Sequence, residues 1–179
     1  MTSPSPSAAP SPPAERTAPD KDYLPWLLPA LQRAEIRAAL RRGDIPAMQD
    51  RAYRYLARYW SGAVWLRTPL LLHAAATAAH PTLRHAEKTG LGDLAADLVE
   101  RNVLSASTVA ARLLAVQRMD LPVAHRHLAG ILHAGAVQRL TLDWHQLYRL
   151  YRSWDFPTVD GRRRNRRRLL EQFHTRVPG

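Results

Sequence analysis

A run of arginines near the C-terminus is the part of this sequence whose residue types and spacing most clearly suggest a chemistry. The stretch "GRRRNRRRLLEQF" covers residues 161–173 and holds six arginines within seven positions, from Arg162 to Arg168. A guanidinium keeps its charge at physiological pH and can bind a phosphate through two parallel hydrogen bonds. The run therefore predicts a surface that binds phosphate groups.

Helical geometry divides these arginines between two sides of one helix. At about 100° per residue, Leu169, Leu170 and Phe173 fall on a single apolar face. The arginines that fall on the opposite side are Arg163, Arg164, Arg167 and Arg168. Arg162 and Arg166 point toward the apolar side, so either their long side chains reach past it to solvent or they precede the start of the helix. We therefore expect an anchored helix that presents at least four guanidiniums to the outside.

This run could be an ordinary solvated helix face or a surface that binds phosphate, and the clustering of like charge distinguishes the two interpretations. Arg163 repels Arg167, and Arg164 repels Arg168, at a cost of about 0.2–0.5 kcal/mol for each pair. The run has no acidic partner before Glu171. A helix face that serves only solubility would mix the two signs of charge. An anionic partner explains the cost, because each arginine that neutralises a phosphate also steepens the salt dependence of binding by roughly 0.9.

The overall charge agrees with a polyanionic partner. The 179 residues include 26 Lys plus Arg against 15 Asp plus Glu, a net charge of +11. Such an excess favours nucleic acid or an acidic membrane surface. The longest apolar stretch, residues 70–79, is far shorter than the roughly 20 residues of a membrane span, so we expect no membrane partner. The absence of cysteine and of a secretory signal indicates a cytoplasmic protein.

Motifs of the common enzyme classes are absent from the sequence. It has no HExxH, no GxxxxGK[ST], no GxGxxG and no GxSxG. The eight histidines include no pair at i,i+4 with a nearby carboxylate, so we expect no metal. The acidic residues are scattered, whereas a metal-dependent nuclease needs them clustered. The sequence predicts a non-catalytic protein without cofactor, catalytic residue or small-molecule ligand.

Helices must position these arginines, because the composition favours helices over strands. Ala and Leu total 54 residues, whereas Val and Ile total 12, and alternation with a period of two is not evident. The segments expected to be helical are 29–42, 46–60, 63–79, 91–101, 108–118, 121–134, 144–154 and 163–174. Residues 1–20, rich in Pro, Ser and Ala, predict a disordered tail. We therefore expect an all-α protein, a compact bundle of about seven or eight helices in a single domain over residues 21–179.

Local signals place several of these helix ends. Asp120 and Asp143 are predicted N-caps of the segments that follow them. Gly43 and Gly135 are predicted to end the helices that precede them.

Aromatic residues on the segment 144–154 permit two interpretations. Trp144, Leu147, Tyr151 and Trp154 recur near helical spacing, which predicts packing in the core. A platform on which nucleic-acid bases stack is the alternative.

Four stretches in a fixed order give the chain a family likeness. "LDWHQLYRLYRSWD" at 142–155, then the basic run, then "RRLLEQFH" at 167–174, resemble the end of the CasB family, the small subunit of the type I-E CRISPR Cascade complex. "RAEIRAALRRG" at 33–43 and "ARLLAVQRMDLPVAHRHLAGILH" at 111–133 resemble its early and central segments. The resemblance spans residues 33–174.

This resemblance implies both a fold and a role. The family is all-α, and two copies lie along the inner side of Cascade, in contact with the other subunits and the guide RNA. Its basic residues hold the target and displaced DNA strands and stabilise the R-loop. Guide pairing reads the sequence, so the protein needs only backbone contacts. The nucleic-acid contacts that the resemblance and the charge pattern assign are Arg37, Arg118, Arg126, Arg162, Arg163, Arg164, Arg166, Arg167 and Arg168.

Two other functions compete with this one. A stand-alone helical DNA-binding regulator would need a recognition helix with base-reading side chains, and usually a dimer seam. A pure assembly protein would use its arginines against acidic protein surfaces. A preference for one duplex sequence would favour the first, and binding to partner subunits without binding to single-stranded DNA would favour the second.

Overall fold

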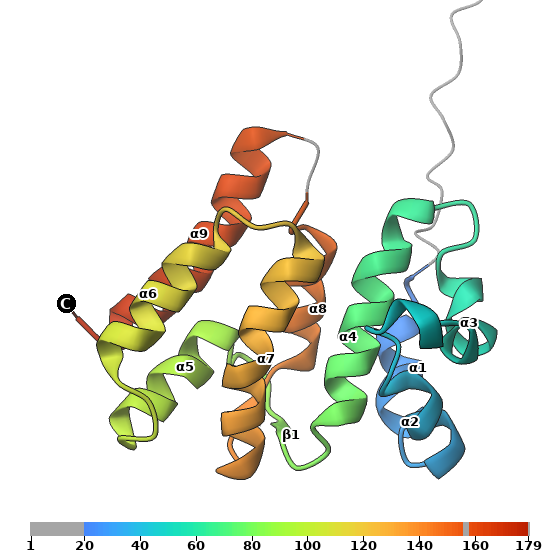
Figure 1. Cartoon of the computed structure of the whole chain (residues 1–179), viewed down its shortest axis with the longest axis horizontal. Helices are drawn as coiled ribbons and strands as arrows, with labels where there is room; N and C mark the ends of the chain where they lie inside the picture. Colours follow the sequence, from blue (N-terminus) through green and yellow to red (C-terminus); the bar gives the residue numbers. More distant parts are fainter. Residues whose placement is uncertain (1–19, 156–157, 179) are drawn as a thin grey trace, which may run out of the picture.

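Nine α-helices form most of the structure over residues 20–155 and 158–178, the part of the chain that this computed structural model describes (Figure 1). The helices are α1 (Tyr23–Ala30), α2 (Ala34–Leu40), α3 (Asp50–Leu56), α4 (Arg67–Ala79), α5 (Leu91–Glu100), α6 (Ala106–Val116), α7 (Leu121–Val137), α8 (Trp144–Arg152) and α9 (Val159–Arg176). The 3-10 turns are η1 (Pro46–Met48), η2 (Ala57–Tyr59) and η3 (Val64–Leu66). Two-residue strands, β1 (Arg84–His85) and β2 (Thr141–Leu142), pair in parallel. The predicted all-α class is confirmed.

Helix α4 lies between two groups of helices. In Figure 1, α1, α2 and α3 lie on one side of α4, while α7 and α8 lie on the other with α5, α6 and α9 beyond them. Ten of the 13 residues of α4 are buried, as the apolar composition of the segment 63–79 predicts for a central helix. Each group of helices has its own apolar core, and α4 contributes to both.

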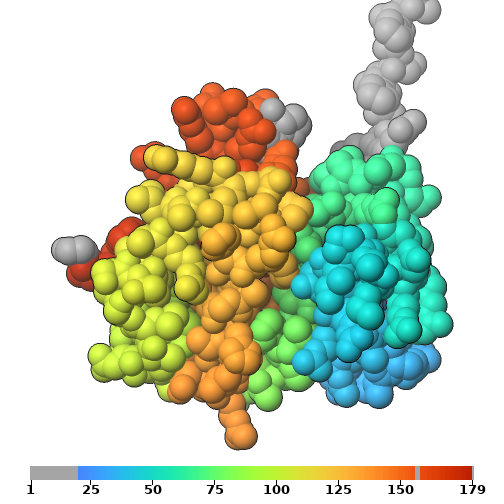
Figure 2. Space-filling view, viewed as in Figure 1, coloured from blue at the N-terminus to red at the C-terminus, as the bar shows by residue number. Residues whose placement is uncertain are grey.

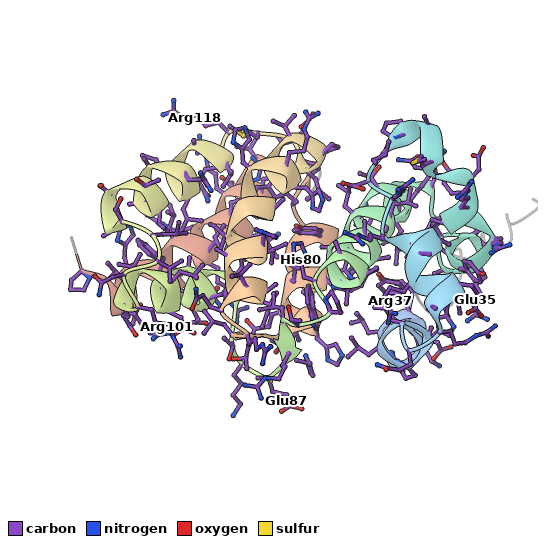
Figure 3. All side chains as sticks on the ribbon, turned by 60° about the horizontal axis from the view of Figure 1, so that its bottom comes forward. Glu35, Arg37, His80, Glu87, Arg101 and Arg118 are labelled. Atoms are coloured by element: carbon purple, nitrogen blue, oxygen red, sulfur yellow. The ribbon has the colours of Figure 1, made fainter. Side chains whose placement is uncertain are left out.

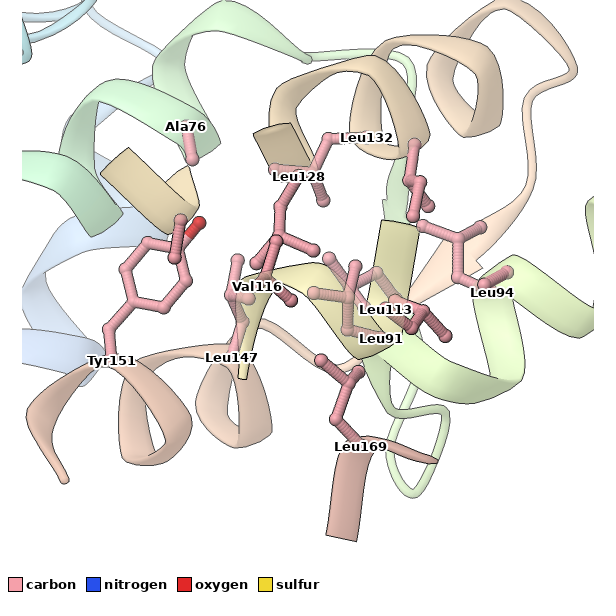
Figure 4. Close-up of a cluster of buried hydrophobic side chains, with 14 of the residues drawn as sticks. Ala76, Leu91, Leu94, Leu113, Val116, Leu128, Leu132, Leu147, Tyr151 and Leu169 are labelled. Carbon is pink, nitrogen blue, oxygen red and sulfur yellow. The ribbon is translucent and has the colours of Figure 1, made fainter. Parts of the chain in front are cut away.

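The larger core anchors the arginine-bearing helix α9. Figure 4 shows Leu91 of α5, Leu113 of α6 and Leu147 of α8 converging near Leu169 of α9. Phe173, one turn further along α9, is fully buried. The apolar face predicted for this helix is therefore its packing face, and the opposite face is left for solvent.

The two helix groups are joined through a buried histidine. His73 of α4 has no exposed surface. Its Nδ1 lies 2.8 Å from the hydroxyl of Tyr23, and its Nε2 lies 2.9 Å from the carbonyl oxygen of Trp144. Burial lowers the pKa of His73 to about 3. This histidine is therefore a neutral connection between α1, α4 and α8.

The predicted N-caps are confirmed. The carboxylate of Asp120 accepts a hydrogen bond from the amide of Val123. The carboxylate of Asp143 accepts from the amides of His145 and Gln146.

The predicted helix over 29–42 is wrong, because the chain turns at residues 31–33. Helix α1 ends at Ala30, and Arg33 is extended, with φ −83° and ψ 120°. The amide of Gly43 donates to the carbonyl oxygen of Leu40, so Gly43 closes the turn that follows α2. Helix α2 lies within the predicted segment, whereas α1 lies almost entirely before residue 29 and was not predicted, so the described residues hold one helix more than the eight expected segments.

The predicted helix stop at Gly135 is also wrong. Helix α7 continues to Val137 and ends where Arg139 takes a left-handed φ of 51°. The amide of Leu140 then bonds the carbonyl oxygen of Gly135, which is the Schellman pattern. A Cβ at Gly135 would lie 2.8 Å from a methyl carbon of Leu94. This glycine therefore allows α7 and α5 to approach closely.

Two further predictions concern the ends and the surface of the fold. The predicted disordered tail lies outside the described residues except for Asp20, which is buried and accepts hydrogen bonds from Tyr148 and Arg152. Trp144 and Trp154 are 3% and 0% exposed, so the core interpretation of these tryptophans is confirmed and neither can stack on a base. Within the described residues, none of the helices has the length and apolarity to cross a bilayer.

Candidate nucleic-acid interface

The first turns of α9 carry the arginine run to the surface. The side chain of Thr158 caps the helix by accepting a hydrogen bond from the amide of Gly161, so the whole run is helical. Figure 2 shows these turns projecting from one end of the molecule. The arginines predicted to face outward are all exposed: Arg163, Arg164, Arg167 and Arg168. Arg162 is half-buried.

Arg166 is buried, and its role differs from the one assigned to it from the sequence. Its residue exposure is 9%. The guanidinium donates to the carbonyl oxygens of Trp154 and Gln117, at 3.1 and 2.6 Å, and to the carboxylate of Asp155 at 3.1 Å. Its carbon also lies 5.0 Å from the centroid of the Trp154 ring. Because its donors are already used inside the fold, we remove Arg166 from the candidate phosphate contacts.

The exposed arginines of this run have few acidic partners. In the described part of the chain, the ion pairs within 4.0 Å include just two members of the run, Arg166 and Arg167. The pair of Arg167 with Glu171 spans 3.9 Å between two exposed side chains, a geometry that contributes little. Among the described residues, Arg163, Arg164 and Arg168 have no such partner.

The first turn of α9 does not account for the arginine run. The helix dipole favours negative charge within the first turn, and Asp160 meets that preference. Arg163 and the exposed arginines after it lie beyond that turn. The electrostatic cost of the run is therefore the mutual repulsion of the arginines, which a bound anion would relieve.

Two hollows along α9 are lined by its exposed arginines. The groove between α8 and α9 is lined by Arg164 and Arg168 together with Arg149. The second hollow is lined by Arg162, Arg163 and Arg167, next to Gln117, and by Arg164, which therefore lines both hollows. Asp160 and Glu171 also line the second hollow. Sequence reasoning missed Arg149 as a candidate, although its place on the polar face of the segment 144–154 was the available signal.

The other candidate arginines lie in three different places. Arg118 is exposed and follows Gln117, whose carbonyl oxygen accepts from Arg166, so it lies beside the run. Arg126 is exposed on α7 and lines neither hollow. Arg37 is half-buried on α2, and its guanidinium donates to the carbonyl oxygen of Leu31. Figure 3 shows Arg37 and Arg118 on opposite sides of the molecule.

A second surface rich in arginine and aromatic residues lies around α3 and was also missed. The stretch "RAYRYLARYW" at 51–60 supplies most of it. The guanidinium carbons lie 4.6–5.4 Å from ring centroids, pairing Arg54 with Tyr55, Arg58 with Trp26 and Tyr59, and Arg67 with Tyr53. All three arginines are exposed. Alternating basic and aromatic residues were the signal, since that pattern is typical of surfaces that bind single strands.

The fold and this surface define a class: a strongly basic all-α protein with clustered guanidiniums exposed on its surface. The family model for CRISPR-associated protein Cse2 matches residues 36–174. The chain therefore belongs to the Cse2 family, which is the CasB family that the four sequence stretches resemble, the small subunit of type I-E Cascade. Every candidate arginine lies within the matched residues.

Solved structures of similar fold agree with this assignment. One chain, in a structure titled "CRISPR RNA-guided surveillance complex", is 24% identical and superimposes with a TM-score of 0.65, over 84% of this chain and 91% of that chain. Another, in "CRISPR RNA-guided surveillance complex, pre-nicking", is 23% identical with a TM-score of 0.68, over 86% and 93%. At these identities the likeness concerns the fold. No curated protein gives a significant match.

Proposed function

We propose that the chain is the non-catalytic small subunit of a type I-E Cascade complex, and that its α9 surface holds sugar-phosphate backbone. The strands held would be the target and displaced DNA near the guide RNA, so that the protein stabilises the R-loop. Family membership supports the place in a surveillance complex. The single observation that carries the binding role is the cluster of exposed arginines on α9, of which only Arg167 has an acidic partner within the described residues, at 3.9 Å.

The arrangement of these arginines suits backbone contact without base readout. Residues four apart on a helix are separated by about 6 Å along its axis. Arg164 and Arg168 form one row, which Arg149 extends, and Arg163 and Arg167 form the other. Two rows of guanidiniums flanking one helix offer two tracks for phosphates. Such contacts position a strand and carry no sequence information.

The remaining parts of the proposal concern partners. Other Cascade subunits, a second copy of the chain, guide RNA and target DNA would surround it. A cytoplasmic location and the absence of catalysis stay predictions of the sequence.

The proposal is tested by removing the four outward guanidiniums of α9 together. The variant is Arg163→Ala, Arg164→Ala, Arg167→Ala and Arg168→Ala, and the measurement is binding to DNA of unrelated sequence across a series of salt concentrations. Each phosphate contact contributes roughly 0.9 to the slope of log K against log salt for duplex, and roughly 0.7 for single strands. We therefore expect the slope on single-stranded DNA to flatten by about three units if all four meet phosphates.

A matched control replaces the same four arginines with lysine. This variant keeps the charge and so keeps most of the slope, while it loses the bidentate geometry. An unchanged slope in the alanine variant would show that these residues do not meet phosphates. If the alanine variant instead fails to assemble with partner subunits while DNA binding persists, the arginines serve protein contacts. A preference of the wild-type protein for one duplex sequence would favour the stand-alone regulator.

A further inference from the structure

Three side chains with metal-ligating atoms meet at the seam between β1 and the start of α8. They are His85, Asp143 and His145, and their ligand atoms all lie within 4.8 Å of one another. His85 is exposed, His145 is half-buried and Asp143 is buried. The two imidazole rings lie 4.9 Å apart between centroids, tilted by 42°. In the described part of the chain this is the one group of three or more such residues.

Backbone contacts hold the three residues in place. The parallel pairing of β1 with β2 sets His85 opposite Leu142. The amide of Asp143 donates to the carbonyl oxygen of Thr89 at 2.7 Å. The amide of Lys88, a residue with a left-handed φ of 69°, donates to Oδ2 of Asp143 at 3.0 Å. The loop after β1 is therefore fixed against the first turn of α8, and the site is organised before any ligand arrives.

The carboxylate of Asp143 keeps one lone pair that these contacts do not use. Its Oδ1 accepts from the amides of His145 and Gln146, and its Oδ2 accepts from Lys88 alone. A carboxylate has about four lone-pair sites, so one on Oδ2 remains. Burial by itself would raise the pKa of Asp143, but the bonds from Lys88, Gln146 and His145 outweigh burial and lower it. The group is therefore an anion at neutral pH.

The imidazole nitrogens are also available. Among the described hydrogen bonds, the ring of His145 makes none, and that of His85 has a long contact of 3.4 Å between its Nδ1 and the amide of Trp144. Other histidines differ, since His73 uses both ring nitrogens and the Nδ1 of His80 contacts a backbone carbonyl oxygen at 2.8 Å. Two imidazoles beside one carboxylate form a donor set of the kind that binds a transition-metal ion.

We propose that His85, Asp143 and His145 bind one divalent transition-metal ion of the zinc class. Two imidazole nitrogens and one carboxylate oxygen suit Zn²⁺ and its neighbours, whereas Mg²⁺ and Ca²⁺ prefer oxygen ligands throughout. Three protein ligands leave a further position for water, and the exposure of His85 gives the ion a path of entry. Bound there, the ion would fasten the chain before α5 to the start of α8.

The three ligand residues are distinct from the candidate arginines, although parts of the two surfaces are neighbours. In Figure 3, Glu87, two residues after His85, lies at the opposite edge of the molecule from Arg118. His85 shares a hollow with Arg37, and Gln146, next to His145, lines the groove of Arg164 and Arg168. Metal binding and phosphate binding are therefore tested with different variants.

The experiment uses the untagged full-length chain after treatment with a chelator. Zn²⁺ is titrated by calorimetry and Co²⁺ by its visible absorption, with Mg²⁺ as the control ion. We expect one equivalent of Zn²⁺ or Co²⁺ to bind and Mg²⁺ not to compete. His85→Ala and His145→Ala should each weaken binding by at least about tenfold, because even outer-shell partners of a metal change affinity by roughly 10- to 100-fold. His127→Ala, which removes an exposed histidine of α7 outside the cluster, should bind as the wild type does.

Two outcomes would overturn the proposal. One is a wild-type chain that binds neither Zn²⁺ nor Co²⁺, which would leave Asp143 as a helix cap alone. The other is binding that His85→Ala and His145→Ala leave unchanged. If His145→Ala does not fold, the His85→Ala variant alone tests the site, because the exposed side chain of His85 can be removed without disturbing the core. The salt slope of DNA binding should stay the same in both variants, so this test is distinct from that of the arginine surface.

Discussion

Replacing Arg166 tests most directly whether the buried arginine of α9 stabilises the fold while the exposed arginines serve binding. Arg166→Ala removes a buried guanidinium that donates to the carbonyl oxygens of Gln117 and Trp154 and to Asp155. Hydrogen bonds from a charged donor are worth about 1.5–3 kcal/mol each and do not add fully within one group. Losing one partner of a buried pair costs about 3–5 kcal/mol. Since Asp155 is half-exposed, we expect about 3 kcal/mol, the lower end.

Thermal unfolding measures this loss directly. For a chain of this size, 1 kcal/mol corresponds to about 2–4 °C in Tm, so Arg166→Ala should unfold roughly 10 °C below the wild type. Arg163→Ala, one turn away and exposed, should stay within about 0.5 kcal/mol. The salt slope of DNA binding should show the reverse order, lower in Arg163→Ala and unchanged in Arg166→Ala under conditions where both are folded. Equal stability of the two variants would refute the structural role of Arg166.

Two further predictions concern packing and pH. Gly92→Ala places a Cβ 2.5 Å from the carbonyl oxygen of Leu169, so α5 and α9 must separate, at about 1–3 kcal/mol in chemical denaturation. Gly130→Ala, the matched control, meets just the flexible end of Arg112 and should gain up to about 1 kcal/mol of helix propensity. His73 is neutral in the fold with its pKa lowered to about 3. Below about pH 6.5 the His73 side chain takes up a proton in the unfolded state but not in the folded state. The free energy of unfolding should therefore fall by roughly 2 kcal/mol between pH 7 and pH 5. Denaturant titration at each pH measures this fall, which should be smaller in His73→Gln.

Local signals in the sequence sufficed for much of the fold. Asp120 and Asp143 could be predicted as N-caps because an N-cap carboxylate accepts hydrogen bonds from amides only two or three residues further along the chain. The central position of α4 follows from an apolar segment without a polar face. Gly135 misled the prediction, because a glycine also serves where two helices touch, and Leu94 on α5 supplies that reason from a distant part of the chain.

The arginine surface was also predicted only in part, because contacts between distant parts of the chain decide the rest. A helical wheel separates Arg166 from Arg163, but it does not show that carbonyl oxygens from two other segments meet the inward guanidinium. The proposed metal site does not show as two histidines one helical turn apart, because His85 reaches Asp143 and His145 through the pairing of β1 with β2. Arg149 joins the run through the packing of α8 on α9. Each is a consequence of tertiary contact.

The arginines of α9 differ in whether the fold gives them a carboxylate partner. At its C-terminal end Arg176 bridges Asp97 and Glu100 of α5, at 2.6 and 2.7 Å. Near its start, Arg166 has Asp155. The fold thus supplies a carboxylate to the arginines that hold α9 in place, one of them inward-facing and the other in its last turn. It supplies none to Arg163 or Arg168 within the described residues, although they lie on the same helix. Mutual repulsion opposes that arrangement, and the phosphates of the proposed nucleic-acid partner would offset it.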